Sequence, residues 1–220
     1  MASPSQQRRQ EEKEARREQL LDAAERVLGE KGFEGVVLAD VAAASRVSRA
    51  LLYSYFRDKT DLFHAVSVRA SDELRERFGR AVLSGRTGLE RIYNLGRAYV
   101  AFSQERPILF EAVARTEASE VDADDEPRPY ALAALEASRE VLSLLAMMVE
   151  QGQADGSVRR SVGDAHAAAI ALWGVVHGVS QVTAHRKGLV QATGVEPETV
   201  HDLTFALLDA ALGGPEPTAE

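Results

Sequence analysis

The stretch VSRALLYSYFRDK, residues 47–59, combines side chains that bind nucleic acid with side chains that fill a protein core. Arginine binds guanine O6 and N7 or a phosphate, tyrosine hydroxyls donate to phosphates, and leucine contacts a thymine methyl. On a helix, Leu52 and Phe56 are four residues apart and share one face, which we expect to be buried. Arg49, Leu51, Tyr53 and Tyr55 then point away from this face, where they are available to DNA.

Three short helical patterns position this stretch. Apolar residues at 20–28 recur at helical spacing, and the run ends at Gly32, with Phe33 expected to pack back on the last turn. A second helix is predicted at residues 38–44, and a third begins near Ser48, whose hydroxyl suits an N-cap. Because three residues separate the last two helices, the spacing predicts a helix-turn-helix, whose second helix enters the major groove.

The rest of the chain is also predicted to be helical. A long helix opens at Asp58, and further helical patterns cover residues 89–105, 107–115, 130–151, 164–186 and 197–212, with no alternating strand pattern. The fold class is therefore all-α, with about nine helices. The expected domains are a mobile N-terminal extension (1–17), a helix-turn-helix domain (18–62), a second helical domain (63–213) and a disordered tail (214–220). The acidic, proline-bearing residues 116–129 are expected to be mobile as well.

Composition restricts the function classes. The chain has no cysteine, which excludes disulfides, thiolate metal sites and thiol nucleophiles. The N-terminus lacks the apolar core of a signal peptide, and no later window has the uninterrupted apolar length of a membrane helix, so we expect a soluble cytoplasmic protein. The net charge of −8 argues against a nucleic-acid partner, yet residues 1–60 carry 11 Lys and Arg against 10 Asp and Glu. This asymmetry suits either a charged partner for the first region or a simple drift of surface charge.

The N-terminal extension has two interpretations. Residues 8–18 alternate five arginines and lysines with four glutamates. The segment either follows the minor groove or the backbone of DNA, or it forms a solvated extension of the first helix with pairs such as Glu12 to Arg16. The balanced charge releases few counterions and favours the second interpretation for the distal residues, whereas Arg16 and Arg17 stay open to both.

The run from about residue 20 to residue 63 resembles the N-terminal domain of TetR/AcrR-type transcriptional regulators. The resemblance rests on EKGFEG at the end of the first helix, on LADVAAASRVS, on ALLYSYF and on KTDLF. It implies that Leu52 and Phe56 hold the third helix to its neighbours. The DNA-binding residues that it implies are Arg46, Ser48, Arg49, Ala50, Leu51, Tyr53, Tyr55 and Lys59.

Three positions depart from the family pattern. Val36 and Val37 replace the usual threonine before the second helix, so a side-chain cap and a phosphate contact are missing. Arg46 replaces the usual glycine of the turn, so a non-glycine residue must adopt a left-handed conformation or the turn must shift. Leu51 replaces a more usual threonine. These changes leave the fold assignment intact and alter the expected base preference.

The resemblance also implies a ligand-sensing and dimerising second domain, whose dimer presents two DNA-binding domains to a palindromic operator. The implied protein is a repressor that a small, mostly apolar molecule releases from DNA. The candidate interface residues are Leu172, Val176, Val179, Leu203, Leu207, Leu208 and Ala211, although the same stripes could pack internally. The candidate ligand-binding residues are Tyr99, Phe102, Phe110, Met147, Met148, Trp173, His177 and Gln181, each of which could equally be ordinary core.

The alternative is a helical di-metal carboxylate enzyme. Glu198-x-x-His201 has the spacing used in di-iron bundles, but that pattern needs a second copy and two further glutamates. The nearest other match is Asp61-x-x-His64. Glu198 follows Pro197 in the first turn of a helix, where the helix dipole favours an acid. There is no HExxH, no GxSxG and no phosphate-binding glycine loop, so we expect a protein without enzymatic activity, metal or cofactor.

Overall fold

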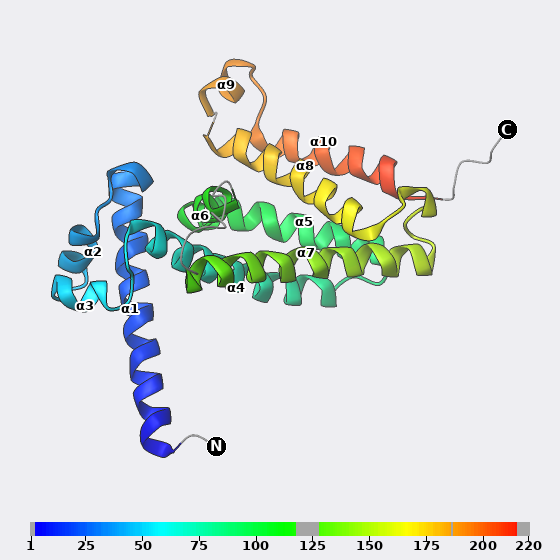
Figure 1. The fold of residues 1–220 in the computed structure, drawn as a ribbon. Coiled ribbons are helices and arrows are strands. Elements are labelled where there is room, and N and C mark those ends of the chain that lie inside the picture. Colours follow the sequence, from blue (N-terminus) through cyan, green and yellow to red (C-terminus); the bar gives the residue numbers. More distant parts are fainter. Residues whose placement is uncertain (1–2, 118–127, 186, 215–220) are drawn as a thin grey trace. The chain divides into compact units, whose positions relative to one another are not determined.

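The computed structural model describes residues 3–117, 128–185 and 187–214, which form helices joined by short turns (Figure 1). The helices are α1 (Pro4–Gly35), α2 (Leu38–Ala44), α3 (Arg49–Tyr53), α4 (Lys59–Leu83), α5 (Gly88–Glu105), α6 (Pro107–Glu117), α7 (Pro129–Asp155), η1 (Arg160–Val162), α8 (Ala165–His185), α9 (Lys187–Ala192) and α10 (Pro197–Leu212). Within these residues the only extended pairing is an isolated bridge between Val158 and Gly213. The predicted all-α fold is confirmed.

Local sequence explains how the helix-turn-helix forms. The regular part of α1 ends at Gly32, whose φ of 70° is accessible to glycine at little cost. Phe33 then turns into the core, where its ring meets that of Phe63 edge-on at 5.0 Å between centroids. The Ser48 hydroxyl caps α3 by accepting the Leu51 N–H at 3.1 Å. The end of the regular helix at Gly32, the packing of Phe33 and the cap at Ser48 are thus all as predicted.

α1 begins at Pro4, where Ser3 and Gln6 form a capping box, so the extension is helical, as the favoured interpretation of it as an extension of the first helix implies. One other α-helical segment was not predicted. A short helix, α9, lies in a stretch with no predicted helix. Mobility of the extension stays a prediction. Residues 118–127 of the acidic segment and 215–220 of the tail lie outside the described residues.

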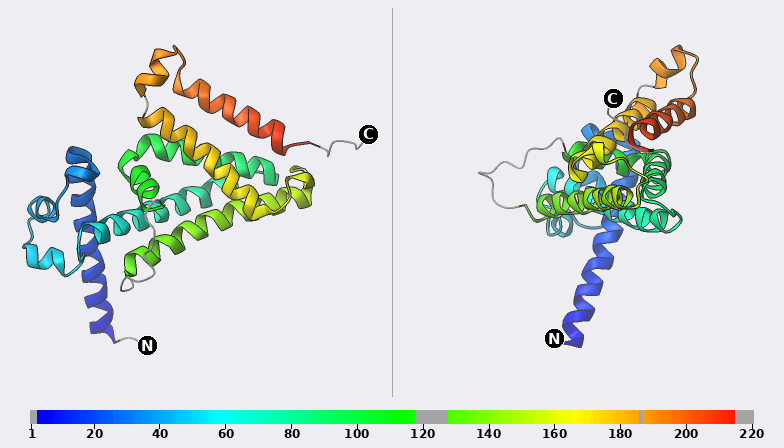
Figure 2. Two further views of the ribbon diagram at one scale, coloured as in Figure 1. Left: turned by 45° about the horizontal axis from the view of Figure 1, so that its top comes forward. Right: turned by 90° about the vertical axis from the view of Figure 1, so that its right-hand side faces the viewer.

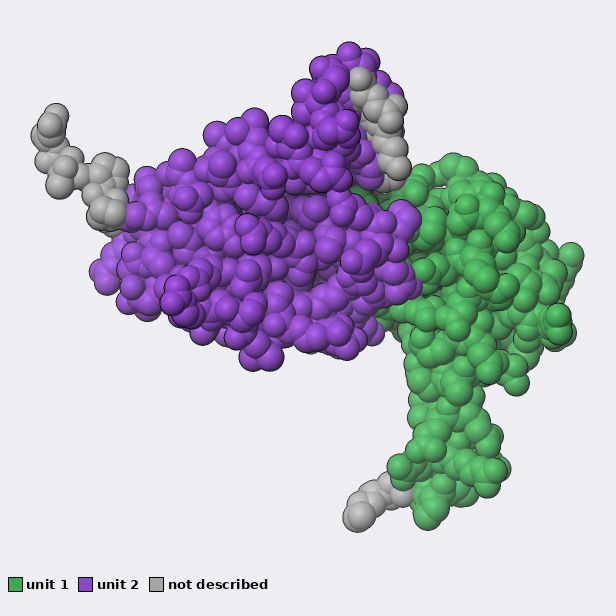
Figure 3. Space-filling view, turned by 180° about the vertical axis from the view of Figure 1, so that it is seen from behind, with its two compact units in different colours: residues 1–70, 108–135 green, residues 71–107, 136–220 purple. Residues whose placement is uncertain are grey.

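The chain divides into two compact units, coloured separately in Figure 3. Unit 1 comprises residues 1–70 and 108–135, and unit 2 comprises residues 71–107 and 136–220. Unit 1 is larger than the expected domain of residues 18–62, because α6 and the start of α7 pack on it. The Arg115 guanidinium lies 4.9 Å from the Phe33 ring centroid, and the Tyr130 ring lies 5.7 Å from that of Phe56.

Unit 2 contains most of the long helices. In it, α8 lies beside both α5 and α10 (Figures 1 and 2). Residues 165–184 of α8 are long and apolar enough to cross a membrane, by length and composition alone, which corrects the expectation that no such window exists. One helix of this kind is weak evidence for a membrane, because a helix that packs on protein can have the same composition. Only a third of this window is buried within the described chain, so much of its apolar surface faces outward.

Candidate functional site

The two faces of α3 are separated as the sequence predicts. α3 ends at Tyr53, earlier than predicted, so Phe56 follows the helix, with its N–H donating to the Leu52 carbonyl at 3.0 Å. Leu52 and Phe56 are both fully buried, which fixes α3 to its neighbours. Leu51 and Tyr53 have exposed fractions of 38% and 55%, and Arg49 beside them is exposed. Ser48 and Ala50 are exposed as well. The result is a short, rigidly anchored helix with a surface that carries a guanidinium, a phenol and an apolar side chain.

The turn between α2 and α3 contains a left-handed residue, one of the two outcomes that the sequence left open. Arg46 has a φ of 56°, and it is the only non-glycine residue with positive φ in the described part of the chain. The Val47 N–H donates to the Ala42 carbonyl at 3.0 Å, and this hydrogen bond closes the turn. The Arg46 side chain is exposed next to the start of α3, so its charge can add to that of Arg49.

Replacing Arg46 by glycine should stabilise the protein by about 1 kcal/mol, because a left-handed residue with a Cβ is strained and glycine is not. Denaturant unfolding of Arg46→Gly measures this gain. Arg46→Lys keeps both the Cβ and the charge and should leave the unfolding free energy unchanged. If glycine gives no gain over lysine, Arg46 is not strained in solution.

The missing threonine cap before α2 has a partial substitute. Val37 makes no side-chain cap, but the Asp40 carboxylate accepts its N–H at 3.3 Å. Asp40 also pairs with Lys31 at 2.7 Å, and this lysine holds the pKa of the carboxyl below its usual range. The first turn of α2 is thus capped by a residue of the helix itself, Asp40. The Val37 side chain is 54% exposed and is apolar at a position where the family pattern has a hydroxyl.

Two of the predicted phosphate-binding residues, Tyr55 and Lys59, already contact other groups of the protein. Lys59 donates to the Glu34 carbonyl at 3.0 Å and lies 5.4 Å from the Phe63 ring centroid. Tyr55 is half-buried beside Phe56. The Lys59 ammonium has three N–H donors, so a phosphate contact can be added to its bond with Glu34. Tyr53 is exposed.

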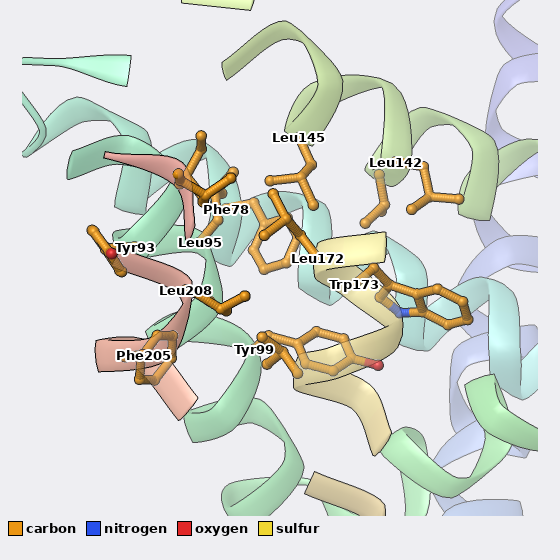
Figure 4. A pocket seen from close by; sticks show the side chains of 15 residues that line it. Phe78, Tyr93, Leu95, Tyr99, Leu142, Leu145, Leu172, Trp173, Phe205 and Leu208 are labelled. Atoms are coloured by element: carbon orange, nitrogen blue, oxygen red, sulfur yellow. The ribbon is translucent and has the colours of Figure 1, made fainter. Parts of the chain in front are cut away.

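Unit 2 encloses a pocket between α4, α5, α7, α8 and α10 (Figure 4). The cavity has a volume of about 50 Å³, which is small for a ligand site, so a ligand must displace side chains of the wall to bind. Gly96 makes room for the Phe205 ring, because a Cβ there would lie 2.7 Å from that ring. The lining residues are Phe78, Ile92, Tyr93, Leu95, Gly96, Tyr99, Val141, Leu142, Leu145, Leu172, Trp173, Val176, Phe205, Leu208 and Leu212.

The two tyrosine hydroxyls of the pocket wall already have partners. The Tyr99 hydroxyl hydrogen-bonds to Nδ1 of His177 at 2.6 Å, and the Trp173 and His177 rings lie 5.1 Å apart. Burial lowers the pKa of His177, which favours its neutral form. The Tyr93 hydroxyl donates to Asp209 at 2.8 Å, and burial, together with this carboxylate, raises the pKa of Tyr93. The wall therefore offers an apolar surface and no charged side chain among the residues that line it.

The pocket agrees with only part of the predicted ligand-binding set. Tyr99 and Trp173 line it, and His177 and Gln181 adjoin it through the Tyr99 hydrogen bond and a 3.4 Å contact between their side chains. The other four residues do not line it, because three are buried in packing and the fourth is half exposed. The buried residues are Phe102, Phe110 and Met148, and the exposed residue is Met147. Phe110 moreover belongs to unit 1.

The predicted dimer interface needs a similar correction. Leu172 and Val176 are buried and line the pocket, and half-buried Leu208 lines it too. Leu203 and Leu207, by contrast, are 59% and 63% exposed. Ala211 is exposed and Val179 is half-buried. Residues on the outward side of α8 are small or apolar and follow helical spacing; they are Ala167, Ile170, Ala171, Gly174, Val175, Gly178 and Val182. The outward faces of α8 and α10 thus present an apolar surface, which we call the α8–α10 face.

The two residue pairs considered for a metal enzyme lie in different units. Glu198 lies in the first turn of α10, and His201 is buried with Nε2 3.3 Å from the Thr183 hydroxyl. Asp61 and His64 lie in unit 1, whereas Glu198 and His201 lie in unit 2. A search of the described residues finds no group of three or more side chains able to hold a metal ion.

Comparison with known proteins identifies two matching family models. Residues 20–66 match the model of bacterial regulatory proteins of the tetR family, and residues 92–210 match that of a tetracyclin repressor-like C-terminal domain. The HTH-type transcriptional repressor KstR of Mycolicibacterium smegmatis is 32% identical over 101 residues, 46% of this chain. That match spans 49% of KstR, so the chain covers about half the length of this curated relative.

Solved structures show the same fold. A protein of unknown function from Rhodococcus sp. RHA1 has a TM-score of 0.73 and 24% identity, over 90% of this chain and 95% of that one. AibR, solved in complex with isovaleryl coenzyme A and operator DNA, has a TM-score of 0.61 and 16% identity, over 86% of this chain and 95% of that one.

Proposed function

Because the chain belongs to the tetR family of bacterial regulatory proteins, we propose that it represses transcription as a dimer on a palindromic operator and that a small, mostly apolar molecule releases it. The observation that carries the proposal is the α3 surface, in which exposed Arg49, Leu51 and Tyr53 stand on buried Leu52 and Phe56. Side chains of these types bind base edges and phosphates when a rigid helix presents them to the major groove. We assign no catalytic role, and a DNA partner makes the cytoplasm the place of action.

The chemistry of the pocket supports an uncharged effector. A buried charge needs a partner, and no cation or anion lines this wall, so an ionised head group would remain unpaired. The walls formed by Phe78, Leu145 and Leu172 suit an alkyl chain or an aliphatic ring. AibR was solved with an acyl coenzyme A, which shares an apolar acyl part but adds a charged nucleotide.

A single helix can connect the pocket to the DNA-binding unit. Phe78 lines the pocket from α4, and Lys59 begins the same helix 19 residues earlier. At 1.5 Å per residue this corresponds to about 28 Å of continuous helix. An effector that displaces the Phe78 ring moves α4 and thereby changes the separation of the two DNA-binding units of the dimer. The effector must bind the released state more tightly than the DNA-bound state for this to happen.

Trp173 makes the effector proposal measurable. It is the chain's only tryptophan and it lines the pocket, so its fluorescence reports on occupancy. We expect decanol to change this fluorescence at lower concentration than decanoate or decanoyl-CoA, and to release the protein from the DNA upstream of its gene. Val176→Phe, which fills the pocket, should abolish both responses. Fluorescence changes without release of DNA would contradict the switch, and tighter binding of decanoate would contradict an uncharged effector.

A further inference from the structure

The first turns of α1 form a charged rod outside the core of unit 1. Residues 3–16 are exposed, and the first fully buried residue of the helix is Leu20. Pro4 to Arg16 spans about 20 Å of helix at 1.5 Å per residue. In Figures 1 and 2, α1 continues well past α3 toward the N-terminus. The segment has no apolar face, so neither a core nor a coiled coil explains why it is helical.

The charges of this segment are separated by helical periodicity. Arg9, Lys13, Arg16 and Leu20 follow one another at spacings of four, three and four residues and therefore share one face, which continues into the buried face of α1. We call Arg9, Lys13 and Arg16 the basic stripe. Most of the acidic residues occupy the opposite face; they are Glu11, Glu14, Glu18, Asp22 and Glu25. Glu12 lies beside the basic stripe, where it pairs with Arg8 at 3.2 Å. The balanced net charge of the extension thus conceals a helix with one basic and one acidic side.

Cations of unit 1 already compensate most of the acidic side. Arg17 pairs with Glu14 at 2.6 Å and with Glu18 at 3.1 Å, and its guanidinium lies 5.4 Å from the Tyr130 ring centroid. Arg69 of α4 pairs with Asp22 at 2.5 Å and lies 3.8 Å from Glu25. Arg17 is therefore a structural residue.

The basic stripe lacks such compensation. Arg16 hydrogen-bonds only the neutral Gln19, at 3.0 Å, and neither Arg9 nor Lys13 has an ion pair with any residue that the structure describes. Three positive charges therefore face outward along about 10 Å of helix. The phosphate backbone of DNA is a polyanion whose spacing matches such a row of cations.

We propose that the basic stripe binds the phosphate backbone of operator DNA as a second contact beside α3. This inference rests on the proposed DNA-binding function. It replaces the interpretation of the extension as a solvated helix. That interpretation rested on the nearly balanced net charge of the extension, but in the helix the positive charges of the basic stripe are gathered on one side. Contacts of this kind add affinity and salt dependence without base specificity.

The test is the salt dependence of binding to the DNA fragment upstream of the gene. The triple variant Arg9→Gln, Lys13→Gln, Arg16→Gln removes the three charges and keeps good helix formers. Each phosphate contact contributes about 0.9 to the slope of log K against log salt, so the slope should become shallower by about 2–3 per protomer. Arg8→Gln with Glu12→Gln is the matched control, because it removes an ion pair of the same helix and leaves the stripe intact. Its slope should equal that of the wild type.

A conservative variant distinguishes contact from folding. Arg9→Lys with Arg16→Lys retains the charges and should retain the wild-type slope even if the triple variant loses helix content by circular dichroism. An unchanged slope in the triple variant, with Arg49-dependent binding intact, overturns the role of the stripe and leaves the proposed function standing. Failure of the wild type to bind the fragment at all overturns both.

Discussion

Replacing Leu203 and Leu207 by aspartate should convert the protein to a monomer and weaken operator binding by about 10²–10⁴-fold. The two leucines are 59% and 63% exposed on α10, beside the outward apolar side of α8. A second copy of this face would cover them, and two carboxylates buried without partners would prevent that packing. A dimer binds both half-sites of a palindrome at once, so a monomer loses the effective concentration that links the two binding events. Sedimentation and DNA titration measure the two effects.

Leu83→Asp is the control for this pair. Leu83 is 84% exposed at the end of α4, away from the α8–α10 face, so its replacement should change neither mass nor DNA affinity. A Leu203→Asp, Leu207→Asp variant that remains dimeric would show that the exposed leucines are not the interface. A monomer that binds the operator as tightly as the wild type would contradict the palindromic arrangement.

Arg49→Ala should cost about 1–3 kcal/mol for each operator half-site and about 2–6 kcal/mol for the dimer. A guanidinium that binds guanine O6 and N7 discriminates by this amount, and two copies act on one operator. The loss should be accompanied by relaxed specificity at one base pair per half-site, measured by titrating fragments substituted at each position. Tyr53→Phe removes a phosphate donor and should weaken binding uniformly across sequences.

Arg80→Ala is the charge-matched control for Arg49→Ala. Arg80 is an exposed arginine of unit 2 that pairs with Glu76, so it changes the net charge equally without touching α3. Its affinity should stay close to the wild-type value. A loss of affinity in Arg49→Ala with no change in base preference would reassign Arg49 from a base to a phosphate.

The sequence was sufficient for the helix-turn-helix because local rules determine it. The four-residue spacing of Leu52 and Phe56 predicts that both are buried, although α3 ends at Tyr53, before Phe56. Of the two outcomes that the sequence left open for the turn, the structure has the left-handed Arg46. The pocket was only partly predictable. α8 is apolar on most sides, so periodicity could not tell that Leu172 and Val176 face the pocket while Ile170 and Val175 face outward.

Two other features that the sequence analysis did not predict, the basic stripe and the place of Phe78 in the pocket, could have been inferred from residue positions. The spacing of Arg9, Lys13 and Arg16 separates the charges of the extension once a helix is assumed, but the helix itself depends on the cap at Ser3. Phe78 could have been assigned to the pocket from its place on the helix that joins the two regions. Unit 1 could not be delimited from sequence, because α6 and the start of α7 join it through tertiary contacts such as that of Tyr130 with Phe56.

The central claim is that two copies of the α3 surface bind a palindromic operator, and nuclease protection of the DNA upstream of the gene tests it most directly. We predict two symmetric protected half-sites on the same face of the duplex, their centres a whole number of helical turns of about 10–10.5 base pairs apart, with protection lost in Arg49→Ala and retained in Arg80→Ala. Protection that is absent, that lacks two-fold symmetry, or that persists unchanged in Arg49→Ala would contradict the account.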